Sequence, residues 1–278
     1  MKHVLMTVAC ASTLLLAAPR PSASSGQTPE RQPFDTILDT YVRDGMVYYR
    51  ALKSDRGKLD TYVNSLAEVN VAQRPREAQI AFWLNAYDAV VLRTVVEHYP
   101  IAVRSKEYPA RSIRQIPGAF DKLTHRIGAS TLTLDQIEQN ILSTYHDPRL
   151  YFAIGRGAVG GGRLRSEAFT PEHLEAQLSE VQGECVSRGC VLVERDAGKV
   201  SASSIFSWRE KDFVAGYADK APTAFANRSP IERAILGFVE PKLLTIERDY
   251  LKDNANTFQV TYTPFDWTLN DLTGRGGR

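Results

Sequence analysis

The sequence predicts an α+β fold, a single mixed domain with several helices packed on a small β-sheet. Apolar residues recur at helical spacing along most of the chain, and two β-rich runs flank a turn at residues 196–198. No internal repeat and no second linker divides the chain. The 278 residues, 43% hydrophobic and 24% charged, are typical of a globular protein with a sizeable core.

The first residues are typical of an export signal. Lys2 and His3 precede an apolar run over residues 4–18, shorter than the roughly 20 residues that a membrane span needs. We therefore expect a periplasmic or secreted protein with no transmembrane segment after signal removal. The alternative, a lipoprotein acylated at Cys10, is disfavoured because residues 6–9 make a poor lipobox. The predicted parts are a signal peptide (1–24), a polar linker (25–33), one globular domain (34–273) and a flexible tail (274–278).

The first half of the domain reads as mainly helical. Helical spacing runs from Phe34 to Val42, and again from Leu59 to Leu66. Between them, "DGMVYYRAL" predicts a turn and a short extended piece. The strongest helix begins near residue 76 and is ended by Pro100, and it is too apolar to lie on the surface.

The second half alternates helices and strands. Thr133 and Gln136 form a capping box at a helix start, and Thr170 with Pro171 predicts another helix N-terminus. The apolar run at residues 150–154 predicts a buried strand. Further along the chain we expect two strands around the turn at 196–198, a helix over 229–241, and a closing strand and turn over 257–271. In that last segment Trp267 should be packed and Asp266 should cap a turn.

The cysteines fit an oxidising compartment. Apart from Cys10, the chain has only Cys185 and Cys190, which we expect to form a disulfide worth about 2 kcal/mol. The alternative is two free thiols in one turn. No second Cys or His pair completes a zinc ligand set, so we expect no metal and no cofactor.

The stretch "YFAIGRGAVGGGRLRSEAF" contains G-x-G-x-x-G, formed by Gly155, Gly157 and Gly160. A dinucleotide-binding loop needs a helix directly after these glycines, so that the pyrophosphate meets the helix N-terminus. Here the next predicted helix start is Thr170, and a chance match to so short a pattern is common. The sequence therefore disfavours a nucleotide loop.

Four segments resemble, in order and spacing, the domain-of-unknown-function family numbered five-forty-seven, found in exported bacterial proteins and in plant proteins. These segments are "AFWLNAYDAVVL", "HDPRLYFAIGRGA…LRSEAFTPEHLEAQL", "VSASSIFSWREKDF" and "FDWTLND". No activity is established for the family as a whole, so the resemblance implies a domain and no reaction.

The chain departs from this family's pattern at its most reactive-looking positions. The family has a histidine where this chain has Tyr151, and two cysteines where it has Arg156 and Gly161. A family proline pair falls on Gly162 and Arg163. Cysteine and histidine together would suit a thiol nucleophile or a metal site, and both residue types are replaced here.

The favoured function is a binding or interaction module with a Gly/Arg-rich loop. Glycine-rich turns can present N–H groups as an anion nest, and arginines bind carboxylate or phosphate bidentately. The ligand would be an anionic small molecule or a cell-envelope protein; a net charge of +2 without basic runs argues against nucleic acid. The candidate ligand-binding residues are Asn85, Arg156, Arg163, Arg165 and Glu167.

Each candidate also has a structural interpretation. The arginines would form a solvated loop with internal ion pairs to residues such as Glu167, and Asn85 would satisfy the backbone of a loop. The alternative function is a cell-envelope hydrolase or transferase in which Glu138, His146 and Asp147 converge beside the glycine loop.

The histidines at positions 98, 125, 146 and 173 are expected at the surface or in caps. A third interpretation, a domain that only mediates assembly, predicts a sizeable exposed apolar patch. The sequence leaves open whether the domain is an enzyme.

Overall fold

The structure, a computed structural model, describes residues 33–272. The predicted signal peptide, linker and tail, together with Cys10, lie outside the described residues, so they remain predictions. Within residues 33–272, no helix is both long enough and apolar enough to cross a membrane.

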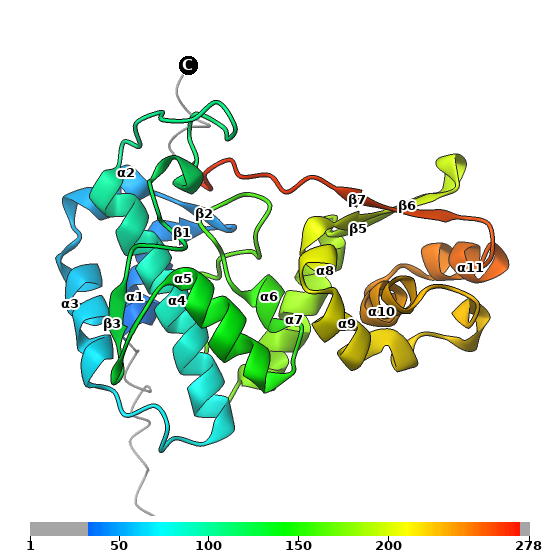
Figure 1. Ribbon diagram of the computed structural model, residues 1–278, viewed down its shortest axis with the longest axis horizontal. Helices are drawn as coiled ribbons and strands as arrows, with labels where there is room; N and C mark the ends of the chain where they lie inside the picture. The colour runs from blue at the N-terminus through cyan, green and yellow to red at the C-terminus, as the bar shows by residue number, and fades with distance from the viewer. Residues whose placement is uncertain (1–32, 273–278) are drawn as a thin grey trace, which may run out of the picture. The chain divides into compact units, whose positions relative to one another are not determined.

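The described elements confirm an α+β fold (Figure 1). The helices are α1 (Pro33–Tyr41), α2 (Tyr49–Ser54), α3 (Gly57–Ser65), α4 (Arg76–His98), α5 (Leu134–Gln136), α6 (Leu150–Ala153), α7 (Leu174–Ser187), α8 (Ser204–Trp208), α9 (Glu210–Tyr217), α10 (Pro230–Val239) and α11 (Thr245–Asp253). The strands are β1 (Val42–Arg43), β2 (Met46–Val47), β3 (His125–Ile127), β4 (Ser130–Leu132), β5 (Val191–Glu194), β6 (Lys199–Ser203) and β7 (Gln259–Thr263).

Helix α4 is the centre of the first half of the domain. Its residues from Ile80 to Leu92 are all buried, because α2, α3 and α5 pack against it and α1 packs against α2 and α3. This explains why its sequence is apolar on every face, as predicted. The helix ends at His98, before Pro100, where the residue preceding a proline disfavours helical backbone.

The strands form three small sheets rather than one. The pairs β1–β2 and β3–β4 are isolated hairpins, and β5, β6 and β7 form a three-stranded sheet in that order. Strands β5 and β6 are antiparallel around a turn that ends in Gly198 at φ +61°, as the sequence predicts. Strand β7 is parallel to β6, and α8 packs against both.

The predicted strand at residues 150–154 is wrong. Leu150–Ala153 is the short helix α6, in which the N–H groups of Phe152 and Ala153 both donate to the carbonyl of Arg149. Asp147 precedes the helix and accepts from the N–H of Arg149 at 3.1 Å. All residues of the run are buried, so the apolar pattern alone could not separate a helix from a strand.

The predicted N-terminus at Thr170 is also wrong. Helix α7 begins at Leu174, and Pro171 lies in the turn before it. The Thr170 hydroxyl caps nothing, whereas its N–H donates to the Gln177 side chain at 3.0 Å. Gln177 also donates to the carbonyl of Ala168, so a side chain from inside the helix holds this loop.

The predicted capping box of Thr133 and Gln136 is confirmed. Helix α5 continues as a π-helical turn, η3 (Ile137–Ile141), which carries the buried Glu138. The helix over 229–241 is confirmed as α10, with a second capping box between Ser229 and Glu232.

The segment after β7 returns to the first half of the domain (Figure 1, red). Its backbone accepts from the N–H groups of Val159 and Gly160 and, at Asn270, from Val47. Asp266 caps a turn by accepting from Thr268 N–H at 2.9 Å, and Trp267 packs against the core, as predicted. The strand order thus brings residues near the C-terminus beside the glycine loop.

Candidate functional site

The glycines after α6 are needed because other backbone lies against them. A Cβ atom on Gly160 would lie 2.6 Å from the nitrogen of Asp266, and one on Gly162 would lie 1.9 Å from the carbonyl oxygen of Phe152. No side chain fits at either distance. The glycine-rich sequence is therefore explained by close packing, without a nucleotide.

The N–H groups of this loop do not form the anion nest that the sequence suggested. Val159 and Gly160 donate to the carbonyls of Thr268 and Asp266, both at 2.8 Å, and Gly162 donates to Ile154 at 3.2 Å. The donors of a nest must point at the ligand, and these are already paired within the protein. An anion near the loop would have to be held by side chains.

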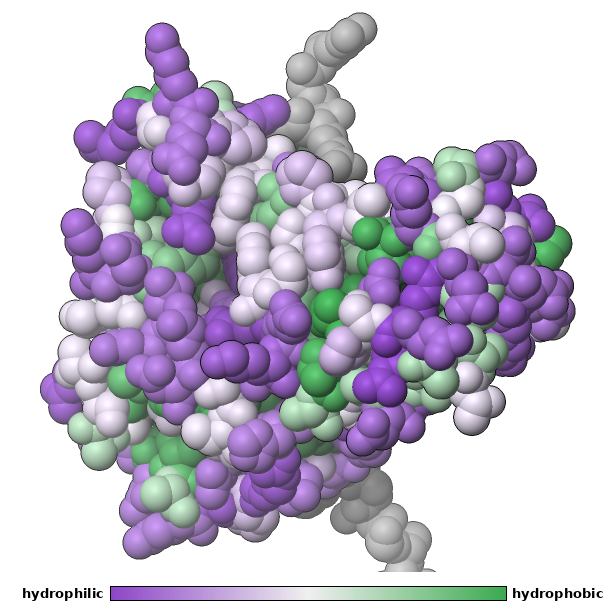
Figure 2. Space-filling view, turned by 45° about the vertical axis from the view of Figure 1, so that its right-hand side comes forward, coloured by the Kyte–Doolittle hydropathy of each residue, from purple (hydrophilic) through white to green (hydrophobic). Residues whose placement is uncertain are grey.

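The loop forms one wall of a cleft of about 410 Å³. The other walls are the β1–β2 turn, the end of α7, the loop that joins α7 to β5, and the segment after β7. On the face drawn in Figure 2, most of the surface is hydrophilic, and hydrophobic residues reach it mainly in the middle. The volume suits a small molecule.

Two arginines and two acidic residues meet in this cleft. Arg163 donates to Glu184 at 2.5 Å, and its Nε lies 3.5 Å from Asp44 Oδ1. Arg188 forms an ion pair with the same Asp44 oxygen. The Asp44 side chain is 73% exposed and lies on the β1–β2 turn. Its carboxylate is therefore an exposed group that two guanidinium groups share.

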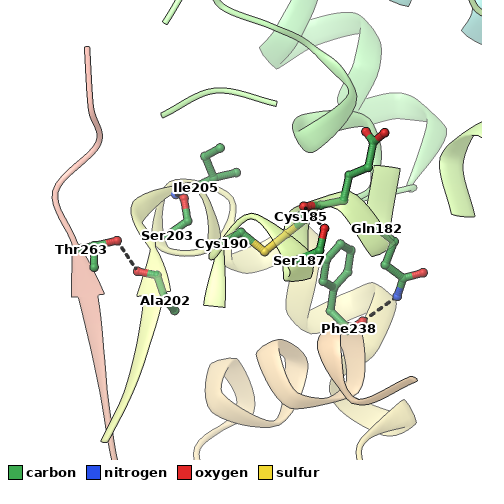
Figure 3. The surroundings of a disulfide bond; sticks show 10 residues. Gln182, Cys185, Ser187, Cys190, Ala202, Ser203, Ile205, Phe238 and Thr263 are labelled. Carbon is green, nitrogen blue, oxygen red and sulfur yellow. Dashed lines mark hydrogen bonds between the residues drawn. A yellow bond between two sulfur atoms is a disulfide. The ribbon is translucent and has the colours of Figure 1, made fainter. Parts of the chain in front are cut away.

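The predicted disulfide between Cys185 and Cys190 is confirmed, with the two Cα atoms 5.1 Å apart. It joins the end of α7 to the residue before β5 (Figure 3). Ser203 of β6 donates its N–H to the carbonyl of Cys190 at 2.7 Å. Arg188 lies in the short loop between Cys185 and Cys190 that the disulfide closes. The disulfide therefore restricts the loop that carries one of the two cleft arginines.

Arg156 lies outside the cleft. Its guanidinium is buried, donates to both oxygens of Glu138 at 2.7 and 3.1 Å, and also donates to the carbonyl of Tyr151. Arg209 donates to the same carboxylate at 2.7 Å. Burial by itself raises the pKa of Glu138, but the two guanidinium groups outweigh it and hold that pKa below its usual range.

The family's histidine and first cysteine positions thus fall in one buried cluster. Tyr151 donates its hydroxyl to Asp212 at 2.5 Å, and the Arg209 guanidinium lies 4.8 Å from the centre of the Tyr151 ring. Beside this pair lies an arginine–glutamate–arginine network formed by Arg156, Glu138 and Arg209. All of these side chains are paired with one another within the protein.

The remaining predicted ligand residues are also engaged. Arg165 is buried and paired with Glu167 at 2.5 Å and with Glu180 at 2.7 Å. Asn85 donates to the carbonyl of Phe169 at 2.8 Å and accepts from its N–H at 2.9 Å. Of the five candidates, only Arg163 lines the cleft.

The acid/base set of the alternative function does not come together. Glu138 is held by two arginines, whereas Asp147 is bound by Arg149 in a separate ion pair and His146 is exposed at the end of η4 (Leu142–Tyr145). A carboxylate with a lowered pKa, already fully hydrogen-bonded, is a poor general acid or base. The geometry therefore gives the hydrolase or transferase hypothesis no support.

His125 departs from the predicted surface position. It is buried in β3, and burial together with the charge of Arg93 lowers its pKa to about 4. His98 and His173 are exposed, as expected. Within residues 33–272, no cluster of three or more His, Cys, Asp or Glu side chains is arranged to hold a metal ion.

The cleft residues that the sequence analysis missed are Asp44, Glu184 and Arg188. Asp44 precedes a glycine in a predicted turn, and Arg188 stands between two cysteines, so both positions were visible as loop residues. No local pattern connects residues so far apart along the chain. Only the tertiary structure brings the β1–β2 turn beside the end of α7 and the loop that follows it.

Fold and site together define a class: an α+β domain with an ion-paired cleft beside a buried arginine network. Residues 71–184 match the model of the family described as "Protein of unknown function, DUF547", which supports the family assignment made from the sequence motifs. The match covers α4, the glycine loop and most of α7. No curated protein and no solved structure matches the chain.

Proposed function

We propose that this protein is an exported binding module whose cleft holds a small ligand through an anionic group. One observation carries the proposal. Arg163 and Arg188, from separate loops, approach the same carboxylate oxygen of Asp44 in a cleft of about 410 Å³. Two guanidinium groups around one oxygen make a site for a carboxylate or a phosphate.

Asp44 occupies the position that a ligand's anionic group would take. Its carboxylate is largely exposed and sits on a two-residue turn with φ +51°, so displacing it disturbs no packed element. Arg163 keeps its second partner, Glu184, which holds the guanidinium in place when Asp44 moves away. A bound ligand would thus replace the exposed ion pair of Asp44 with the arginines by an ion pair between its own anionic group and the same arginines, deeper in the cleft.

The acidic residues limit the class of ligand. Glu184 and Asp266 line the cleft together with Asp44, so acidic groups outnumber the two arginines. A polyanion would meet repulsion, whereas a ligand with a single carboxylate or phosphate would not. The ligand class is therefore a small molecule with a single anionic group, with room for a cationic group near the acids.

A thermal-shift screen of the mature protein against small carboxylates, amino acids and phosphate monoesters tests this function. A ligand at a hundredfold excess over its Kd stabilises by about 2.7 kcal/mol, so binding should be visible. Arg163→Ala and Arg188→Ala should each abolish the shift, whereas Asp44→Asn should increase it, because the competing carboxylate is lost. Arg126→Ala, on the exposed side of β3, is the matched control.

The arginine variants and the Asp44→Asn variant are expected to change the thermal shift in opposite directions, so the outcomes are easily distinguished. A shift that survives in Arg163→Ala, or one that Asp44→Asn weakens, would show that the anion binds elsewhere. No shift with any of the three ligand classes would contradict the proposed function.

The proposed export has its own test. Residues 1–33 fused to alkaline phosphatase, an enzyme that needs oxidised disulfides, should give phosphatase activity in a bacterial host. A fusion with Leu14 and Leu15 both replaced by arginine interrupts the apolar run and should give none. Equal activity from both fusions would contradict an export signal in these residues.

A further inference from the structure

A second cavity lies beside Trp208, at the start of α9. It is an open groove of about 660 Å³, lined among others by Gln139, Ser143, Ser207 and Trp208. It shares no lining residue with the cleft that holds Arg163. The groove falls on the segments "SIFSWREKDF" and "IEQNILS", whose side chains the proposed function does not use.

Trp208 is nearly half exposed and yet held in place. The residue is 47% exposed. The centre of its ring lies 5.0 Å from that of the Phe265 ring and 6.2 Å from that of the Trp267 ring, to which it is nearly parallel. Trp267 is in turn fixed by Phe120 at 5.6 Å and by the Arg114 guanidinium at 4.2 Å. Trp208 thus presents a rigid aromatic surface, whose presentation to a ligand costs little conformational entropy.

The polar side chains of the groove can still bind a ligand. The hydroxyls of Ser143 and Ser207 donate to backbone carbonyls of their own helices, at 2.5 and 2.8 Å, and keep lone pairs for accepting. The Gln139 amide is exposed. Within the described part of the chain, neither that amide nor the Trp208 indole N–H has a hydrogen-bond partner, so both remain available.

The charges of the groove cancel. Arg209 is already bound to Glu138, and Asp212 to the hydroxyl of Tyr151. The remaining charged residues, Glu210 and Lys211, are one acid and one base. With no net charge to attract it, an anionic ligand gains nothing here over bulk solvent.

We propose that this groove binds a neutral carbohydrate, independently of the arginine cleft. A pyranose ring has one face of C–H groups, which would lie on the Trp208 ring, and an edge of hydroxyls, which would meet Gln139, Ser143 and Ser207. An acyl chain would leave these polar groups without partners, which costs free energy. The combination of one fixed aromatic surface and uncharged polar side chains favours a sugar over lipid or polyanion.

The test is titration of the mature protein with three probes: cellotetraose, maltotetraose and tetra-N-acetylchitotetraose. Binding is followed by calorimetry, and also by tryptophan fluorescence, because Trp208 is far more exposed than the buried Trp83. We expect at least one probe to bind. Trp208→Ala should weaken that binding at least tenfold, and Ser207→Ala a few-fold.

Two control variants show whether any weakening of oligosaccharide binding is specific to the groove. Tyr48→Ala removes an exposed aromatic ring remote in sequence from the groove and should leave binding unchanged. Arg163→Ala should also leave it unchanged, since that residue lines the other cavity. Failure of all three oligosaccharides to bind, or equal binding by wild type and a folded Trp208→Ala variant, would overturn the proposal.

Discussion

Two arginines of one loop, Arg156 and Arg163, have opposite roles. The Arg156 side chain is 3% exposed and bound to a carboxylate that is buried as well. The Arg163 side chain is 25% exposed, and one of its partners, Asp44, lies at the surface. The first arginine is part of the core, and the second lines the cleft.

The difference shows that the partner, more than the arginine itself, decides what a charged side chain can do. The Glu138 carboxylate is buried and cannot be hydrated in the folded protein, so its ion pair with Arg156 is not exchanged for water. Asp44 can return to water at little cost, so its pair with Arg163 can be exchanged for a ligand.

Glu138→Gln should produce the largest change. It leaves Arg156 and Arg209 without a counter-charge, and stranding a buried charge costs about 3–5 kcal/mol of unfolding free energy. Arg163→Ala, which removes a partly exposed pair, should change the same quantity by less than about 1 kcal/mol. Urea unfolding of both variants measures the difference. Similar losses for the two variants would contradict the division into a buried and an exchangeable arginine.

Asp88, next to the buried network, should make stability depend on pH. Burial raises its pKa to about 7, although a hydrogen bond from Gly155 N–H and the charge of Arg156 act in the opposite direction. The unfolded carboxyl ionises near pH 4 while the folded one stays protonated until about pH 7, so this group's contribution to stability is lost as pH rises between these values. The loss is on the order of 4 kcal/mol.

Asp88→Asn tests this, because the amide oxygen can still accept from Gly155. The free energy of unfolding of the variant relative to wild type should rise between pH 4 and pH 7. His125, whose pKa is lowered to about 4, acts in the opposite direction over the same window, since its contribution is lost as pH falls from about 6.5. The variant must therefore be compared with wild type at each pH; a difference that stays constant with pH would contradict a raised pKa.

Gly162→Ala should separate the packing of the loop from its charges. The added Cβ would meet the carbonyl oxygen of Phe152 at 1.9 Å, and neither backbone can shift without disturbing the core. We expect a loss of about 3 kcal/mol. Gly57→Ala is the matched control, because its Cβ would meet nothing within 4 Å and alanine favours a helix. In thermal unfolding, Gly162→Ala should lower Tm relative to wild type and Gly57→Ala should raise it. A Gly162→Ala variant as stable as wild type would contradict the observed loop path.

Removal of the disulfide should lower stability less than the changes in the buried network and in the glycine loop. Cys185→Ser together with Cys190→Ser opens a short loop and should cost about 2 kcal/mol. Because the loop carries Arg188, ligand affinity at the cleft should fall as well, while the Arg156 network is unaffected. A double variant with lowered stability but unchanged ligand binding would show that the disulfide does not position Arg188.

Part of the site was predictable from the sequence. Arg163 was a candidate because it follows the glycines, and the Cys185–Cys190 bond followed from the number and spacing of the cysteines. Arg156 and Arg165 looked equivalent to Arg163, because a sequence shows charge but neither burial nor partner. Asp44 and Arg188 could not be connected to it, since they lie on other elements and meet it only in the folded chain.

Local spacing in the sequence was enough to predict the apolar helix α4, the capping box at Thr133, the hairpin of β5 and β6 and the disulfide. These features depend on hydrogen bonds and contacts between residues that are near one another along the chain. The tertiary structure alone decided that Leu150–Ala153 is helical, that β7 is parallel to β6, and that only one arginine of the loop faces the cleft. Burial and ion pairing depend on residues brought from distant parts of the chain, and no local pattern carries that information.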